Sequence, residues 1–379
     1  MSLEKYRNEI DKIDDEISKL FKRRMEIAKD IAIVKKAENK PIVNVAREKE
    51  IINRVAGEMP YELKLYSKQV FNTIFDVSKA YQSNFFNETS KIKEKITKVL
   101  ENGLERFPIE ANVACQGVLG SYSSIATERL FEISNILYFK DFEGVFNAVD
   151  KGLSQYGVLP IENSSVGSVN KVYDLMNKYS FYIVKSYKLR VQHSLAAKPG
   201  AKLSQIKEII SHEQAIEQCG EFLNNHKDIK ITICDNTALA ARNVSQLDRD
   251  DVACICSSEA AKAYNLKELA KNIQDNDNNY TRFIVISKDF KIFINSNRIS
   301  IMVNLPHTAG SLNKFLNEFS IRGLNLTKLM SRPQPKSPFD FIFYFDFEAN
   351  IEDESVVNLI SILENQVEQF VFLGYYQEV

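Results

Sequence analysis

A hydrophobic seam near the start of the chain constrains the fold more than any other feature. It runs from Leu3 to Glu38 without a glycine or proline, about 36 residues or ~54 Å of helix at ~1.5 Å per residue. Its apolar residues alternate steps of three and four, the spacing of a helix face that packs on another helix. They are Ile10, Ile13, Ile17, Leu20, Ile27, Ile31 and Val34. A helix of this length predicts an intertwined dimer.

A cation interrupts this seam. Arg24 occupies a position where a leucine is expected, and burying a guanidinium costs several kcal/mol unless an anion meets it. Either an acidic side chain pairs with it, or the helical core holds an anionic ligand. Lys35 points within about 20° of the same direction, whereas Arg7 points about 100° away. By this geometry Arg7 can reach the pocket of a partner subunit but not its own.

Two further helices carry polar residues. The second helix has Arg47 and Glu48 near its start. The third, predicted from about residue 61 to residue 86, places Ser78 and Gln82 one turn apart at the edge of its apolar face. Solvation at the edge of a core is the simpler explanation for each of these two side chains taken alone.

Taken together, this pattern over about the first 85 residues resembles the all-helical chorismate mutases. The resemblance implies that cations and an amide hold the chorismate dianion and stabilise the charge that grows on its ether oxygen as it rearranges to prephenate. It implies Lys35 and Gln82 as the catalytic donors to that oxygen. The implied substrate-binding residues are Arg7, contributed by a partner, and Arg24, Asn44, Arg47, Glu48 and Ser78. Asn44 replaces an aspartate common in the family, which leaves a vestigial mutase as an alternative.

Composition sets the broad class. The chain has 379 residues, enough for two or three domains. With 44% hydrophobic residues, 26% charged residues and a formal net charge of -1, it predicts a globular protein with little support for nucleic acid or membrane as a partner. No apolar run approaches about 18 residues, which predicts a cytoplasmic location. Five cysteines, an odd number, argue against a disulfide framework. We expect no metal site and no cofactor.

The sequence pattern changes twice beyond the helical region. Residues 89–108 are polar and predict a linker helix. From residue 111 short strands alternate with helices, as in an α/β domain. Glycines 117 and 120 are followed by hydroxyls at 121–124 where a helix begins, an arrangement whose free N–H groups suit a carboxylate. Serine is also an ordinary helix cap.

Several motifs between residues 111 and 287 resemble prephenate dehydratase. They are Pro-Ile-Glu-Asn-Ser at 160–164, His193-Ser-Leu-Ala, Ser211-His212-Glu213-Gln214, Gln218-Cys219 and Asn278-Asn279-Tyr280-Thr281-Arg282-Phe283. The resemblance implies two α/β lobes around a cleft, with the chain crossing near residue 189 and returning near residue 272. Glu213 stands where the family usually has proline.

The implied reaction expels the ring hydroxyl and carbon dioxide from prephenate, so the leaving oxygen needs a proton or a strong donor. By resemblance Thr281 is that donor. Because a threonine hydroxyl is too weak an acid to act alone, Glu162 is the candidate acid behind it and His212 the second candidate. The implied substrate-binding residues are Ser121, Tyr122, Ser123, Asn163, Ser164, Ser211, His212, Gln214, Gln218, Arg282 and Phe283. For Gln218 and Ser124 a purely structural role is equally open.

The last part of the chain predicts the order βαββαβ. The elements are a strand at 298–305, a helix at 310–322, strands at 324–331 and 339–347, a helix at 352–366 and a strand at 371–377. The sequences of two loops resemble those of the amino-acid-binding ACT domain that follows prephenate dehydratases. The resemblance implies phenylalanine as the effector. The implied effector site comprises Ala309, Gly310, Ser311, Leu312, Met330, Ser331 and Arg332. Met330 replaces the family's usual glutamate.

The sequence thus predicts a multidomain enzyme. Its parts are an all-α intertwined helical chorismate mutase domain at 1–88, a linker at 89–108, a two-lobed α/β prephenate dehydratase domain at 109–287 and a βαββαβ ACT domain at 298–379. The dehydratase lobes are expected near 109–189 with 272–287, and at 190–271. The predicted activity converts chorismate to prephenate and then to phenylpyruvate in phenylalanine biosynthesis, inhibited by phenylalanine, in a homodimer or larger homo-oligomer. The alternative class is a non-catalytic small-molecule sensor.

Overall fold

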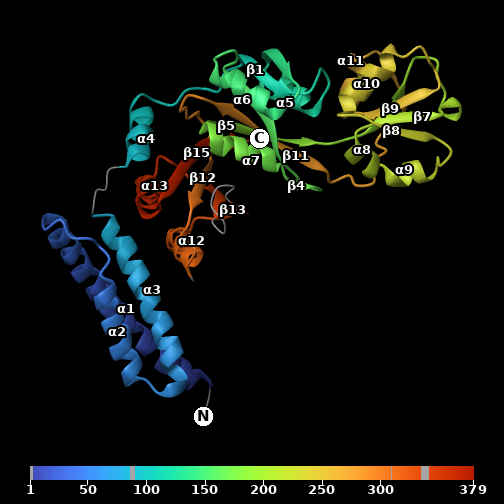
Figure 1. The fold of residues 1–379 in the computed structure, drawn as a ribbon. Coiled ribbons are helices and arrows are strands. Elements are labelled where there is room, and N and C mark those ends of the chain that lie inside the picture. The colour runs from blue at the N-terminus through green and yellow to red at the C-terminus, as the bar shows by residue number, and fades with distance from the viewer. Residues whose placement is uncertain (1–2, 86–89, 309, 334–340) are drawn as a thin grey trace. The chain divides into compact units, whose positions relative to one another are not determined.

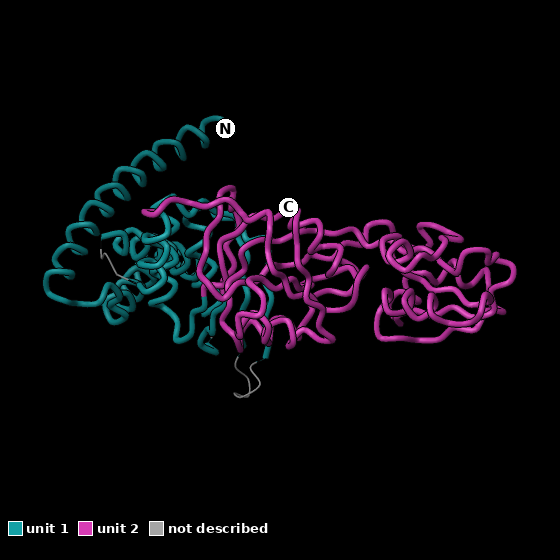
Figure 2. The backbone as a smooth tube through the Cα atoms, turned by 90° about the horizontal axis from the view of Figure 1, so that it is seen from above, with its two compact units in different colours: residues 1–100, 302–371 teal, residues 101–301, 372–379 magenta. Residues whose placement is uncertain are grey.

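The computed structural model describes residues 3–85, 90–308, 310–333 and 341–379 of the chain. It divides into two compact units, residues 1–100 with 302–371, and residues 101–301 with 372–379 (Figure 2). Two strands, β12 (Arg298–Asn304) and β15 (Gln369–Glu378), each contribute residues to both units. Within the described ranges, no helix combines the length and apolarity that crossing a membrane requires.

The first unit begins with three helices, as predicted (Figure 1). They are α1 (Leu3–Ala37), α2 (Val45–Glu58) and α3 (Lys64–Ser83), the last preceded by a 3-10 turn at Tyr61–Leu63. Asn44 caps α2, because its side-chain oxygen accepts a hydrogen bond from the Arg47 N–H at 3.1 Å. A short polar side chain at this position satisfies a backbone donor that the helix itself cannot pair.

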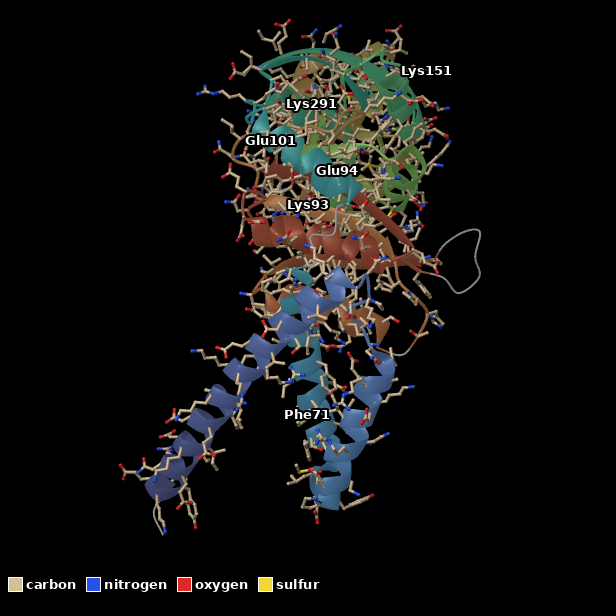
Figure 3. All side chains as sticks on the ribbon, turned by 90° about the vertical axis from the view of Figure 1, so that its left-hand side faces the viewer. Phe71, Lys93, Glu94, Glu101, Lys151 and Lys291 are labelled. Carbon is tan, nitrogen blue, oxygen red and sulfur yellow. The ribbon has the colours of Figure 1, made fainter. Side chains whose placement is uncertain are left out.

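The predicted seam of α1 is present but is not buried within the chain. Ala28 and Ala32 are the buried residues of α1. Seam residues such as Ile17, Leu20 and Ile31 stay exposed, with 57%, 67% and 44% of their surface accessible. In Figure 3, where Phe71 marks α3, the first half of α1 diverges from α2 and α3. The described residues of one chain thus leave this apolar stripe of α1 uncovered.

The rest of the first unit confirms the predicted order βαββαβ. Between β12 and β15 lie α12 (Ser311–Ile321), β13 (Leu326–Pro333), β14 (Phe341–Glu348) and α13 (Glu354–Gln366). The predicted linker helix is shorter than expected, because α4 spans only Lys91–Glu101 and Gly103 follows with a positive φ. On α13, the Glu364 carboxylate accepts the Ile92 N–H of α4 at 3.2 Å.

The first lobe of the second unit is a mixed sheet with the order β15-β5-β11-β3-β1-β2. Its strands are β1 (Glu110–Gln116), β2 (Ile133–Phe139), β3 (Tyr156–Asn163), β5 (Tyr182–Arg190) and β11 (Tyr280–Ser287), with β4 (Gly167–Ser168) beside β3. The helices are α5 (Tyr122–Leu130), α6 (Phe142–Asp150) and α7 (Asn170–Tyr179). β11 runs antiparallel between β3 and β5, which places its residues at the centre of the sheet.

The second lobe is a five-stranded sheet with the order β10-β6-β9-β7-β8. Its strands are β6 (Ser194–Ala197), β7 (Glu208–Ser211), β8 (Lys230–Ile233), β9 (Val252–Cys256) and β10 (Lys267–Ala270). Its helices are α8 (Glu213–Glu217), α9 (Gly220–Asn224), α10 (Thr237–Gln246) and α11 (Ser258–Ala263). The chain crosses between the lobes after β5 and returns before β11 (Figure 1). The crossings lie between Arg190 and Ser194 and between Ala270 and Tyr280.

The lobes touch beside the loop that precedes α5. Gly120 has φ +79°, and a Cβ added there would lie 2.7 Å from the Ala260 Cα of α11. The Ser257 hydroxyl donates to the Gly120 carbonyl at 3.1 Å. Only glycine permits both this backbone conformation and this close approach. The contact holds the start of α5 against the second lobe.

Candidate active sites

The centre of the predicted dehydratase site is a pair of side chains on neighbouring strands of the first lobe. Thr281 of β11 lies opposite Asn163 of β3, and Asn163 Nδ2 donates to Thr281 Oγ1 at 2.9 Å. The other end of this amide is fixed, because Asn163 Oδ1 accepts the backbone N–H groups of Ser165 at 2.9 Å and Val166 at 3.1 Å. Since the Thr281 oxygen accepts from Asn163, its own O–H remains available to donate to a ligand.

A chain of hydrogen bonds continues from this pair into the second lobe. Asn163 Nδ2 also donates to Asn279 Oδ1 at 2.9 Å, and Asn279 Nδ2 donates to Gln218 Oε1 at 3.1 Å. His193 Nε2 lies 3.0 Å from the same Gln218 oxygen. Burial lowers the pKa of His193 below its usual value, which favours the neutral ring. Asn279 and His193 occur in the dehydratase-like motifs, but the sequence assigned neither a role.

The opposite face of the same strands carries a different cluster. Arg282 lies opposite Glu162 in the register of β11 and β3, and consecutive strand residues face opposite sides. Arg282 and Glu162 therefore lie on the face away from Thr281. The Arg282 side chain is buried, and its Nε lies 2.9 Å from Glu378 Oε2. The structure thus does not bring Glu162 or Arg282 to the Thr281 hydroxyl.

Glu378 is the anion at the centre of this second cluster. Its carboxylate also pairs with Arg298 Nη2 at 3.0 Å and Lys188 Nζ at 2.7 Å. Burial alone would raise the pKa of Glu378, but the hydrogen bond from Lys188 and the charges of Arg282 and Arg298 outweigh it and lower the pKa. Residues 372–378 of β15 therefore form part of the dehydratase-like unit, although the sequence grouped them with the regulatory region.

Three further residues that the sequence analysis named are buried. Phe283 is 1% exposed in the hydrophobic core of the first lobe. The Ser211 hydroxyl is buried and donates to the Ile255 carbonyl at 2.7 Å. Ser124 is buried and lies 2.9 Å from the Tyr138 hydroxyl. These three side chains are therefore buried and engaged within the fold.

The remaining predicted residues of this region lie in or next to helices α5 and α8, or where β3 meets β11. Ser121 and His212 cap α5 and α8 with their side chains, and Gln214 lies in α8. The Ser164 hydroxyl accepts the Tyr280 N–H at 2.9 Å and so ties the end of β3 to the start of β11. Ser123 is buried within α5. The Tyr122 hydroxyl donates to the Gln192 carbonyl at 2.6 Å where the chain crosses between lobes.

The helical region brings together three of its predicted residues. Arg24 Nη1 donates to Ser78 Oγ, and its guanidinium lies 5.6 Å from the centre of the Phe75 ring. No acidic side chain is paired with Arg24 among the salt bridges of the described residues, and burial lowers its pKa. Gln82 is buried, and its Oε1 has no hydrogen-bond partner in the described part of the chain. A partly buried cation with no acidic partner in the described residues favours the ligand explanation over the internal ion pair.

The other predicted residues of the helical region have local partners. Lys35 Nζ donates to the Ile42 carbonyl at 2.6 Å. Arg47 pairs with Glu50 at 2.8 Å, and Glu48 lies 3.6 Å from Lys79 Nζ. Arg7 is exposed on the diverging half of α1. One chain therefore gathers only part of the predicted set around Arg24.

The predicted effector loop borders a cavity in the first unit. The cavity measures about 310 Å³ and is lined by Leu305, Pro306, His307, Thr308, Ser311, Leu312, Phe341 and Phe343. Gly310 precedes α12 with φ +85°, which glycine adopts readily. Ser331 lies opposite Phe343 in the register of β13 and β14, with Met330 and Arg332 on either side. Ala309 lies outside the described residues.

Two different protein families match two separate parts of the chain. The family model of chorismate mutase type II matches residues 6–83, and that of prephenate dehydratase matches residues 113–291. The helices and the two-lobed cleft therefore define a protein with a mutase region followed by a dehydratase.

The chain resembles bifunctional proteins and also dehydratases. It is 30% identical to the bifunctional chorismate mutase/prephenate dehydratase of Buchnera aphidicola, over 98% of this chain and 95% of that protein. It is 34% identical to arogenate dehydratase/prephenate dehydratase 2 of Arabidopsis thaliana, over 79% of this chain and 80% of that protein. The solved structure of prephenate dehydratase in complex with L-Phe from Arthrobacter aurescens is 26% identical with a TM-score of 0.64, over 70% of this chain and 89% of that one. The chain belongs to the bifunctional chorismate mutase/prephenate dehydratase family.

Proposed function

We propose that the chain catalyses two consecutive reactions of phenylalanine biosynthesis, from chorismate to prephenate and from prephenate to phenylpyruvate. Matches to both family models support the pair of activities. The observation that carries the dehydratase assignment is the anchored Asn163 amide, which leaves the Thr281 hydroxyl free to donate.

The dehydratase step places Thr281 at the leaving oxygen. The electron pair of the bond to the departing carboxylate becomes a ring double bond and expels the ring hydroxyl. The leaving oxygen takes up one proton and departs as water. Thr281 donates a hydrogen bond to that oxygen as negative charge develops on it. Because Asn163 holds Thr281 in advance, this donor needs no reorganisation during the reaction.

The mutase step uses fixed donors and needs no proton transfer. Arg24 binds a carboxylate of chorismate, and Lys35 with Gln82 stabilises the charge on the ether oxygen. The burial of the Gln82 side chain supports this role, because a donor removed from water interacts more strongly with a developing charge. A second copy of the chain covers the exposed seam of α1 and supplies Arg7, so the mutase site belongs to a homodimer.

Phenylalanine acts as the feedback inhibitor of the dehydratase. The βαββαβ order and the cavity beside α12 support an ACT regulatory region that binds it. Inhibition then follows from a higher affinity of phenylalanine for a less active arrangement of the enzyme.

Incubation of the purified chain with chorismate tests both activities. Prephenate should appear first and phenylpyruvate after it, and supplied prephenate should give phenylpyruvate directly. Formation of phenylpyruvate from prephenate but no turnover of chorismate would favour the vestigial mutase. Turnover of neither substrate, with phenylalanine still bound, would favour the sensor.

A further inference from the structure

The amide chain in the cleft has only one possible direction. It starts at Asn163, whose oxygen is occupied by two backbone N–H groups. Its NH2 group donates to Asn279 Oδ1, so the NH2 group of Asn279 must face Gln218. The group of Gln218 that meets Asn279 is therefore its oxygen. Each amide fixes the orientation of the next.

The direction of this chain determines which ring nitrogen of His193 carries the hydrogen. His193 Nε2 lies 3.0 Å from the Gln218 oxygen. Two acceptors cannot hydrogen-bond to each other, so Nε2 must carry a hydrogen and donate it. The neutral ring then carries no hydrogen on Nδ1, which lies 3.2 Å from the Tyr122 oxygen. The single Tyr122 hydrogen points mainly to the closer Gln192 carbonyl at 2.6 Å, so the tautomer is set by Gln218 and not by Tyr122. The sequence motif containing His193 carries no other assigned function.

The fold holds His193 so that its ring cannot turn away. Its side chain is 2% exposed. Its backbone N–H donates to Gln274 Oε1 at 2.9 Å, and its carbonyl accepts the Ile273 N–H at 3.0 Å. Both partners belong to the returning crossing of the chain. His193 is thus fixed at the point where the two crossings meet.

Fixing the oxygen of Gln218 also fixes its nitrogen. Both described hydrogen bonds of this side chain use Oε1, one from His193 and one from Asn279. Neither of these bonds uses the Nε2 group, so it remains available to donate to a ligand. Prephenate carries two carboxylates, which a side-chain N–H2 attracts and a side-chain oxygen repels. A Gln218 rotated by 180° would present the wrong group.

We propose that His193 is a positioning residue of the dehydratase, whose Nε2–H holds Gln218 with its NH2 group toward the anionic substrate. The inference rests on the proposed dehydratase function and assigns His193 a role through Gln218. It predicts that loss of the Nε2 donor weakens substrate binding more than it slows the chemical step.

The test compares His193→Asn and His193→Gln in the full-length protein. Asparagine places its donor near the Nδ1 position, whereas glutamine reaches the Nε2 position. His193→Asn should raise KM for prephenate about 10-fold with a smaller change in kcat, as for loss of one hydrogen bond that orients a charged contact. His193→Gln should recover most of that loss. His226→Asn serves as the matched control, because its ring contacts Phe222 and not the amide chain.

Two measurements separate this role from a structural one. In a Gln218→Ala background, His193→Asn should have no further effect on KM, since its effect passes through Gln218. Nitrogen-15 NMR of the unmodified protein should show the His193 hydrogen on Nε2. Additive effects, equal damage by asparagine and glutamine, or a hydrogen on Nδ1 alone would each overturn the proposal. An unchanged circular dichroism spectrum and unfolding midpoint report that each variant is folded. An unmodified protein inactive on prephenate contradicts the dehydratase function rather than this inference.

Discussion

In the predicted dehydratase site the polar side chains hydrogen-bond to one another. In the mutase region several predicted side chains instead pair with a neighbouring backbone carbonyl or a surface glutamate. Asn163 donates to Thr281 and Asn279 at 2.9 Å each. Lys35, by contrast, donates to a neighbouring carbonyl, and Arg47 pairs with an exposed glutamate. We therefore propose that one chain holds the whole dehydratase site but only part of the mutase site.

Burial shows the same contrast. The strands that carry Asn163 and Thr281 lie inside a sheet with an apolar core on either side. The helix that carries Arg24 leaves most of its seam exposed. A site built on strands within one unit can be rigid without a ligand. A site on a helix whose apolar face is uncovered needs a partner to become rigid.

The largest expected effect is at Thr281. Thr281→Val keeps the shape of the side chain but removes the hydroxyl donor, so dehydratase kcat should fall about 10³-fold. Phenylpyruvate formation from supplied prephenate measures it. Thr281→Ser should restore a large part of the rate, and mutase activity should not change in either variant. A valine variant with normal kcat would remove Thr281 from the reaction.

A smaller loss is expected at Gln82, in the less complete site. Gln82→Ala removes a neutral donor from the mutase transition state and should lower mutase kcat about 10²-fold. The consumption of chorismate measures it, and dehydratase activity on prephenate should persist as the control. Equal loss of both activities would show that the two sites are not independent.

The Glu378 cluster gives a prediction about stability. Glu378→Gln should lower the free energy of unfolding by ~2 kcal/mol, because charged partners lose their anion. The folded-state pKa of Glu378 is lowered. Its contribution is therefore present above the unfolded carboxyl pKa of about 4.3 and is lost as the pH falls through the folded value. Urea titrations should show the difference between unmodified and variant protein shrinking at acid pH; a constant difference would contradict the ion pairs.

The smallest effect concerns the regulatory cavity. Ser311→Ala should weaken phenylalanine binding about 5-fold, because it removes one hydroxyl from the cavity wall. Calorimetric titration measures the affinity. Ser320→Ala, on the same helix but exposed and away from the cavity, is the matched control. Absence of binding at millimolar phenylalanine would reject the effector site.

Local patterns in the sequence predicted the elements well. The seam spacing predicted a helix from Leu3 to Glu38, and α1 ends at Ala37. The alternation of strands and helices predicted the βαββαβ order. These features depend on neighbours within a few residues, which a single sequence displays directly.

Contacts between residues far apart in the sequence were harder to predict. Glu162 and Asn163 are adjacent in sequence, yet strand alternation places only Asn163 with Thr281. Glu378 forms an ion pair with Arg282, which lies 96 positions earlier in the sequence, and no local pattern predicts that pair. Likewise, His193 approaches Gln218 only because two crossings of the chain meet. Register and chain crossings decided these contacts, and neither can be read from periodicity.

Subunit mixing tests the central comparison most directly. Inactive Arg7→Ala and Arg24→Ala proteins, mixed under conditions that exchange subunits, should regain about one quarter of the mutase activity, because half of the dimers would be mixed and one of their two sites intact. Thr281→Val mixed with Asn163→Ala should regain no dehydratase activity, because each chain holds its own complete site. No recovery of the mutase, or recovery of the dehydratase, would contradict the account.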